Sequence, residues 1–134
     1  MKKTARKSDC PIHFASEIFG DRWTLLIIRD LMFKGKKHYG EFLNAEEKIA
    51  TNILADRLVL LEQSGIINKK QDANHKSKLV YSLTQKGLDL LPLLTEIILW
   101  SAKYDENTAA DKGFVEMAKS NRSTLYDLVL EKLG

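Results

Sequence analysis

The sequence has few of the residues that build disulfide frameworks, membrane spans or secretory signals. A single cysteine, Cys10, among 134 residues excludes an intramolecular disulfide scaffold and predicts a reduced, cytoplasmic setting. The longest apolar run, around LLPLLTEIILW, is interrupted by Pro92, Thr95 and Glu96 and is too short for a membrane span of ~20 residues. Basic residues at the N-terminus are not followed by an apolar core, so we expect neither a secretory signal nor a membrane partner.

Residue types that could bind a metal or perform catalysis are scattered along the chain and form no motif. His13, His38 and His75 lie far apart, without cysteines at ligand spacing, which argues against a zinc site. The seven glycines mark helix ends and turns rather than a phosphate-binding loop. The acidic pair Glu46-Glu47 stands in a polar stretch typical of solvated surface. We therefore expect no metal, no cofactor and no enzymatic activity.

The charge of the chain is uneven, although its net value is only +3. Residues 1–78 contain 15 Lys or Arg against 10 acidic residues, whereas residues 79–134 contain 6 against 8. This asymmetry is consistent with a first part that faces a polyanion and a second part with another role, but weakly basic surfaces are also common elsewhere. The hydrophobic content of 44% is enough for one domain with its own core.

Helical periodicity and helix-stop residues predict four helices in the first half of the chain. A Pro in the first turn and a Gly at the end delimit the first of them. The expected ranges are about 11–19, 21–33, 39–43 and 51–64.

After Gly65 the hydrophobic period changes from helical to alternating. IINKKQ and KLVYSLT are predicted to form two strands joined by the polar loop DANHKS. Thr84 should begin a long helix that runs to Tyr104 and is kinked by Pro92. Its apolar residues cover more than one stripe, so it requires two partners, and the second is expected to be another copy of the chain. One or two further helices should follow.

This order of elements predicts a mainly α fold with a small β-hairpin, a winged helix-turn-helix in which the helix before the hairpin enters the DNA major groove. That recognition helix spans about 51–64. Base contact is predicted for the residues on its early, outward side: Thr51, Asn52, Ala55 and Asp56. Asp56 has an alternative role, because phosphates repel a carboxylate: it would then pair with a neighbouring basic side chain.

Basic side chains gather in the predicted wing, about 66–83, and just before the third helix. The residues predicted to contact DNA phosphates are Lys36, Lys37, His38, Tyr39, Lys69, Lys70, His75, Lys76 and Lys78. Only Asp72 opposes them in the hairpin. Lysines also favour exposed turns that bind nothing, and Tyr39 has packing as an alternative role.

Several separate motifs resemble the HxlR-type winged helix-turn-helix transcriptional regulators, relatives of the MarR group. In chain order they are CPIHFASEIFGDRWTLLIIRDL, KKHYGEF, ILADRLVLLEQSGII and VYSLTQKGLDLLPLL, and they cover about Cys10 to Tyr104. The resemblance implies a homodimeric DNA-binding protein that represses or activates nearby genes. The wing departs from the family pattern, because it lacks the proline that members often have before the Val-Tyr strand.

The resemblance divides the chain into a basic tail (1–9), a winged helix-turn-helix domain with its dimerisation helix (10–104) and a helical extension (105–134) beyond the usual family end. The extension either thickens the dimer interface or caps the core. The residues expected at the dimer interface are Ile12, Leu94, Ile97, Ile98, Trp100 and Tyr104.

Cys10 precedes a predicted helix N-terminus near Lys7 and His13, where the helix dipole and positive neighbours favour the reactive thiolate. Some regulators that the chain resembles use an equivalent cysteine to sense oxidants or electrophiles. The alternative is a small buried residue that packs the first helix. Exposure of the thiol decides between the two.

Together these features predict a homodimeric, sequence-specific regulator that binds double-stranded DNA. Two recognition helices would contact a near-palindromic operator with half-sites about one helical turn apart. The alternative is a winged-helix protein–protein interaction module that uses the same face without sequence-specific DNA binding. The operator, the sign of regulation and any small-molecule effector are not indicated by the residues.

Overall fold

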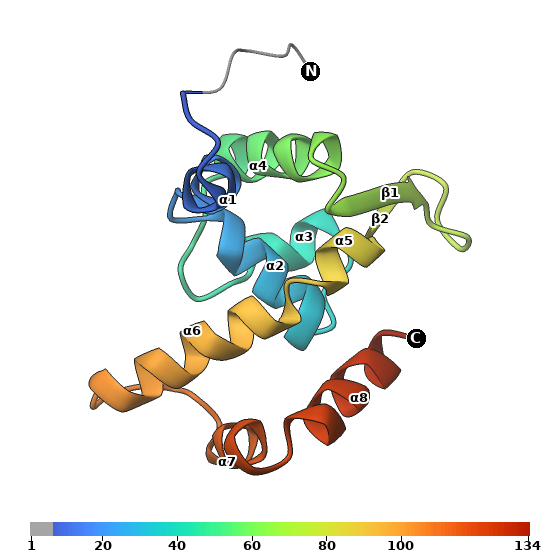
Figure 1. Cartoon of the computed structure of the whole chain (residues 1–134). Helices are drawn as coiled ribbons and strands as arrows, with labels where there is room; N and C mark the ends of the chain where they lie inside the picture. Colours follow the sequence, from blue (N-terminus) through green and yellow to red (C-terminus); the bar gives the residue numbers. More distant parts are fainter. Residues whose placement is uncertain (1–6) are drawn as a thin grey trace. The chain divides into compact units, whose positions relative to one another are not determined.

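The computed structural model describes residues 7–134, which divide into two compact units at the junction between Gly87 and Leu88. Residues 1–6 of the predicted basic tail lie outside the described residues. Figure 1 shows the order of the elements along the chain.

The first unit has the elements of a winged helix-turn-helix, as predicted. They are α1 (Pro11–Phe19), α2 (Thr24–Phe33), α3 (Tyr39–Leu43), α4 (Thr51–Gln63), the strands β1 (Ile67–Gln71) and β2 (Leu79–Leu83), and α5 (Gln85–Leu88). The strands form an antiparallel hairpin in which Lys69 lies opposite Tyr81. In Figure 1 the hairpin projects beyond the C-terminal end of α4, as a wing does.

Helix α2 begins three residues later than predicted because Asp21 caps it. The Asp21 carboxylate accepts hydrogen bonds from the backbone N–H groups of Trp23 and Thr24 and from the Thr24 hydroxyl. These bonds satisfy donors that a helix start leaves without intrahelical partners. The predicted residues 21–23 therefore form the capping turn of the helix.

The core of the first unit is apolar and comes from the helices and the strands alike. Its most deeply buried side chains are Ile28, Phe42, Leu54, Leu61, Ile66 and Ile67. The rings of Phe42 and Tyr81 meet edge to face with centroids 6.0 Å apart, which joins α3 to β2. The Tyr81 N–H also donates to the Lys37 carbonyl at 2.8 Å. The wing is thus fastened to the segment that precedes α3.

Glycine is required at one turn and at one close backbone approach beside the wing. Gly65 ends α4 with a positive φ of 76°, and this turn leads the chain into β1. Gly87 lies against the backbone of Ile66, where an added Cβ would collide with the Ile66 carbonyl oxygen. A side chain at position 87 would therefore push α5 away from the start of the hairpin.

The second unit consists of α6 (Leu91–Tyr104), α7 (Lys112–Ser120) and α8 (Arg122–Leu133). The prediction of a single kinked helix from Thr84 to Tyr104 was wrong, because the helix stops at Leu88 and a new one begins at Leu91. Pro92 lies in the first turn of α6, where its missing N–H costs no hydrogen bond and its fixed φ suits a helix start.

The predicted C-terminal helices are present as α7 and α8. Asp111 caps α7 by accepting from the Phe114 N–H at 2.8 Å. Arg122 donates to the Ala118 carbonyl at 2.9 Å and to the Glu96 carboxylate at 2.5 Å, which ties α8 to α7 and α6. Of the helices in the described part of the chain, none is both long and apolar enough to cross a bilayer.

Candidate nucleic-acid interface

Helix α4 has a buried face and an exposed face. Leu54, Leu58 and Leu61 are buried and anchor the helix on the core of the first unit. The residues predicted to contact bases are all exposed on the opposite side: Thr51, Asn52, Ala55 and Asp56. The structure therefore brings these four side chains together on one accessible surface at the N-terminal half of α4.

Asp56 is paired with the residue that follows it. Arg57 donates to the Asp56 carboxylate at 2.5 Å and to the Asp21 carboxylate at 2.7 Å. Burial alone would raise the pKa of Asp21, but hydrogen bonds from Thr24 and Arg57 lower it to about 2. The basic neighbour considered for Asp56 is thus Arg57, which itself is held by the cap of α2.

Tyr39 links the two helices of the helix-turn-helix. Its hydroxyl donates to the Thr51 carbonyl at 2.8 Å, in the first turn of α4. This contact fixes the start of α4 relative to α3. Tyr39 therefore has a positioning contact within the chain in addition to its predicted role at a phosphate.

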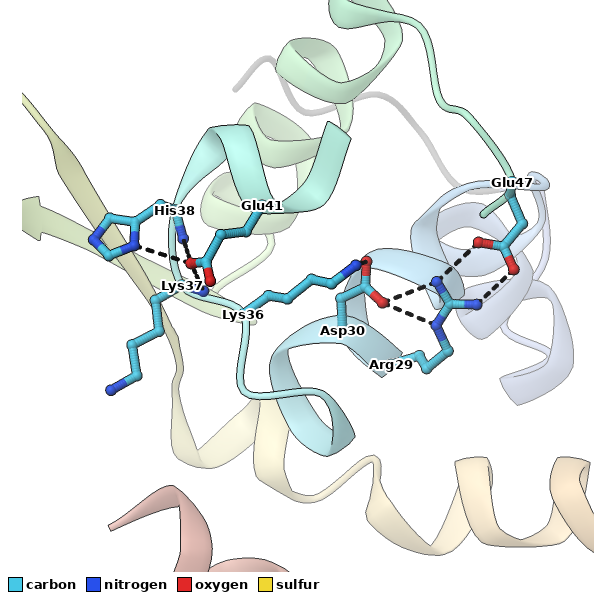
Figure 2. Close-up of polar contacts among 7 residues, drawn as sticks. All are labelled: Arg29, Asp30, Lys36, Lys37, His38, Glu41 and Glu47. Carbon is cyan, nitrogen blue, oxygen red and sulfur yellow. Dashed lines mark hydrogen bonds and ion pairs between the residues drawn. The ribbon is translucent and has the colours of Figure 1, made fainter. Parts of the chain in front are cut away.

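His38 joins the start of α3 to the wing loop. Its Nδ1 lies 2.9 Å from the Glu41 carboxylate, and its Nε2 lies 2.9 Å from the Asp72 carboxylate. Glu41 also accepts from the backbone N–H groups of Lys37 and His38, which completes a capping box (Figure 2). Both ring nitrogens of this predicted phosphate contact are therefore engaged by carboxylates.

This arrangement predicts that the wing loop becomes more mobile as the pH rises. Hydrogen bonds to Asp72 and Glu41 raise the pKa of His38 above 6.5. The stabilisation that protonated His38 gives to the folded chain is therefore complete below the pKa of the unfolded chain, and it is lost as the pH rises through the higher pKa of the folded chain. Amide NMR signals of the loop residues should shift and broaden as the pH rises above 6.5, through the raised pKa of His38. In His38→Gln this pH-dependent transition should be absent. His75→Gln, which removes the histidine of the wing loop itself, should retain it. An unchanged transition in His38→Gln would exclude the contact between His38 and Asp72 as its cause.

A second ionic network lies on the other side of α3. Arg29 donates to the buried Asp30 at 3.0 Å and forks onto Glu47, in the turn before α4, at 2.7 and 3.0 Å. Hydrogen bonds from Arg29 lower the pKa of Glu47 to about 2. The Lys36 ammonium lies 3.4 Å from Asp30, whereas the Lys37 side chain extends away from these contacts (Figure 2). Of these two predicted phosphate contacts, Lys37 is the accessible one.

All four lysines of the wing are exposed. Lys70, Lys76 and Lys78 are exposed, as is His75, and Lys69 lies 3.5 Å from Glu62 of α4. Asp72, the acidic residue of the loop, accepts from the Asn74 N–H at 2.8 Å and from His38. The negative charge of Asp72 is therefore engaged in contacts within the chain, and the exposed charged side chains of the wing loop are basic.

Apolar side chains are exposed on α1 and α6. Ile12, Trp100 and Tyr104 are 76%, 67% and 63% exposed, and the rings of Trp100 and Tyr104 meet at a tilt of 51° with centroids 5.4 Å apart. Ile97 is also exposed, and Ile98 is half-buried. Leu94 differs from the other members of this predicted set, because it is buried within the single chain.

Cys10 lies at the N-cap of α1, and its thiol is exposed. The alternative of a buried packing residue is therefore wrong for this chain. In the described part of the chain, no group of three or more His, Cys, Asp or Glu side chains is arranged to hold a metal ion.

The residues that sequence reasoning missed are Arg29, Glu47 and Arg57. Each forms an ion pair that positions the helix-turn-helix. Their charges were visible in the sequence, but their partners are 18 and 36 positions away for Arg29 and Arg57, beyond the reach of helical spacing.

Comparisons with known proteins agree with this geometry. A family model described as an HxlR-like helix-turn-helix matches residues 18–109. The uncharacterized HTH-type transcriptional regulator sll1512 of Synechocystis is 35% identical over 85 residues, which are 63% of this chain and 62% of that protein. The chain thus spans less than two thirds of that relative. YodB of Bacillus subtilis, an HTH-type transcriptional regulator, is 34% identical over 98 residues, which are 72% of this chain and 87% of YodB.

Solved structures show the same fold. The reduced form of YodB aligns with a TM-score of 0.60 and 31% identity, over 75% of this chain and 99% of YodB. YodB has also been solved in diamide-treated and quinone-bound forms. The redox regulator HypR in its oxidised form aligns with a TM-score of 0.63 and 28% identity, over 72% of this chain and 99% of HypR. The chain therefore belongs to the HxlR-like helix-turn-helix family of DNA-binding transcriptional regulators.

Proposed function

We propose that the chain acts as a homodimer that binds a near-palindromic operator and regulates transcription. The observation that carries this proposal is the exposed N-terminal half of α4, with Asn52 on its surface, beside a hairpin with exposed lysines. Asn can bond adenine through two hydrogen bonds, and lysines neutralise phosphates without regard to sequence. In this proposal α4 lies in the major groove and the wing contacts the backbone or the minor groove.

Selection of bound fragments from the host genome with purified protein tests the proposal directly. A shared near-palindromic sequence with half-sites about 10 base pairs apart is the expected result. A protein–protein interaction module with the same fold would recover no common sequence. The selected operator then supplies the DNA for the measurements below.

Salt dependence should report the phosphate contacts of the wing. Because each neutralised phosphate releases counterions, the affinity for the operator should fall steeply with salt. Lys69→Ala and Lys76→Ala should each flatten the slope of log K against log salt by ~1, as measured by fluorescence anisotropy titrations. Lys112→Ala in α7 is the matched control and should leave the slope unchanged. Weak binding to every DNA, insensitive to these lysines, would contradict the proposal.

The exposed thiol supports a redox response as part of this function. Cys10 is accessible, and the relatives YodB and HypR have been solved in redox-related forms. We propose that oxidation of Cys10 changes the affinity for the operator. Two thiols, one from each subunit, would lose two electrons and two protons to an oxidant such as diamide and form one disulfide.

Diamide should convert the dimer into a covalent species on a non-reducing gel and change operator affinity by about tenfold or more. Cys10→Ser should show neither effect while it retains the affinity of the reduced protein. Dithiothreitol should reverse both changes. The absence of a covalent dimer and of an adduct, with unchanged affinity, would rule out the redox response but not the DNA-binding function.

A further inference from the structure

The exposed face of α4 has an apolar stripe beside its polar residues. Thr51, Ala55 and Val59 follow at four-residue spacing, so their side chains line one side of the helix. All three are exposed, and Val59 is 48% exposed. The core of the unit is supplied by Leu54, Leu58 and Leu61, so the exposed Val59 side chain is available to a partner.

The same stripe borders a hollow between α4 and the hairpin. Ala55 and Val59 line it together with Leu58, Tyr39, Tyr81 and the ion pair of Glu62 with Lys69, and its volume is ≈150 Å³. Most of this lining is apolar or aromatic. Ala55 and Val59 have no side-chain donor or acceptor, so they cannot form hydrogen bonds with base edges.

The acidic residues near the stripe are both paired. Glu62 lies 3.5 Å from Lys69, and Asp56 is bonded to Arg57. Lys69 lines the same hollow, and Lys70, Lys76 and Lys78 are exposed on the hairpin and its loop. The surroundings of the stripe are thus compatible with a polyanion, and the stripe is continuous with the surface for which DNA binding is proposed.

The apolar group that B-DNA displays in its major groove is the 5-methyl group of thymine, and small apolar side chains are its usual contacts. We infer that Ala55 and Val59 recognise a thymine in each half-site through this methyl group. The contact adds an apolar component to the recognition of bases by Asn52. This inference rests on the proposed function, because it requires α4 in the major groove.

Substitution of uracil for thymine in the selected operator tests the contact, because it removes only the methyl group. One thymine position per half-site should show a loss of about fourfold in affinity, the value of one buried methyl group. In Val59→Ser the same substitution should have almost no effect. Serine has a helix propensity close to that of valine, and residue 59 is exposed, so thermal melting should be nearly unchanged.

Asn52→Ala is the matched control on the polar side of α4. It should lower the affinity for the operator but leave unchanged the ratio of the affinities for the thymine operator and the uracil-substituted operator. The inference is overturned if every uracil-substituted operator binds as tightly as the thymine operator. It is also overturned if uracil substitution lowers the affinity of Val59→Ser as much as that of the unchanged protein. Both results leave the proposed function intact, whereas failure to select any common sequence overturns the function and the inference together.

Discussion

Trp100→Glu is expected to convert the protein into a monomer and to lower operator affinity by about 100-fold or more. Trp100 is 67% exposed on α6 and meets the ring of Tyr104, itself 63% exposed, at a tilt of 51°, so its replacement costs little in the isolated chain. In a dimer that buries this ring, glutamate would place an unpaired charge in the interface, which costs several kcal/mol. Each subunit would then hold its half-site alone. Sedimentation velocity and anisotropy titrations measure the two effects.

Two variants control for charge and for size. Ser123→Glu, at an exposed position in the first turn of α8, adds the same charge where the helix dipole favours it and should preserve the dimer. Trp100→Phe keeps an apolar ring and should weaken the dimer only mildly. A Trp100→Glu protein that remains a dimer with full affinity would exclude this face of α6 as the interface.

The local elements of the first unit could be predicted because each has its own signal. Pro11 and Gly20 delimit α1, and the alternation after Gly65 indicates the strands of the wing. The second unit was harder, because Pro92 is compatible either with a kink inside one helix or with the start of another. No residue pattern in the sequence decides between these two possibilities, whereas in the structure Pro92 lies in the first turn of a new helix, α6.

The polar contacts that position the site could not be predicted, since they join residues far apart in the chain. His38 meets Asp72 across 34 positions, and Arg57 meets Asp21 across 36. His38 was predicted to contact a phosphate, and no partner was predicted for Arg57 or Asp21. Only folding shows that His38 lies between two carboxylates, so residue type predicted a DNA-contact surface but not which of its charges are already paired within the chain.

The pairing of Asp56 gives the second large prediction. In the described structure Arg57 holds both Asp56 and Asp21, so the acidic group on the recognition helix is compensated. Arg57→Ala would leave the Asp56 carboxylate uncompensated toward the DNA phosphates and remove a hydrogen bond from the cap of α2. We expect operator affinity to fall by about tenfold or more and the free energy of unfolding to fall by about 1–3 kcal/mol.

A double-mutant cycle separates the two effects. Asp56→Ala in the Arg57→Ala background should restore much of the operator affinity, because it removes the repulsive charge, but it should not restore stability, because Asp21 still lacks its partner. Arg57→Lys should restore neither fully, since one ammonium cannot reproduce the fork that reaches both carboxylates. Affinities come from anisotropy titrations at fixed salt, and unfolding free energies from urea denaturation. If Asp56→Ala leaves the affinity of Arg57→Ala unchanged, Asp56 does not face the DNA, and Arg57 acts through the position of α4 alone.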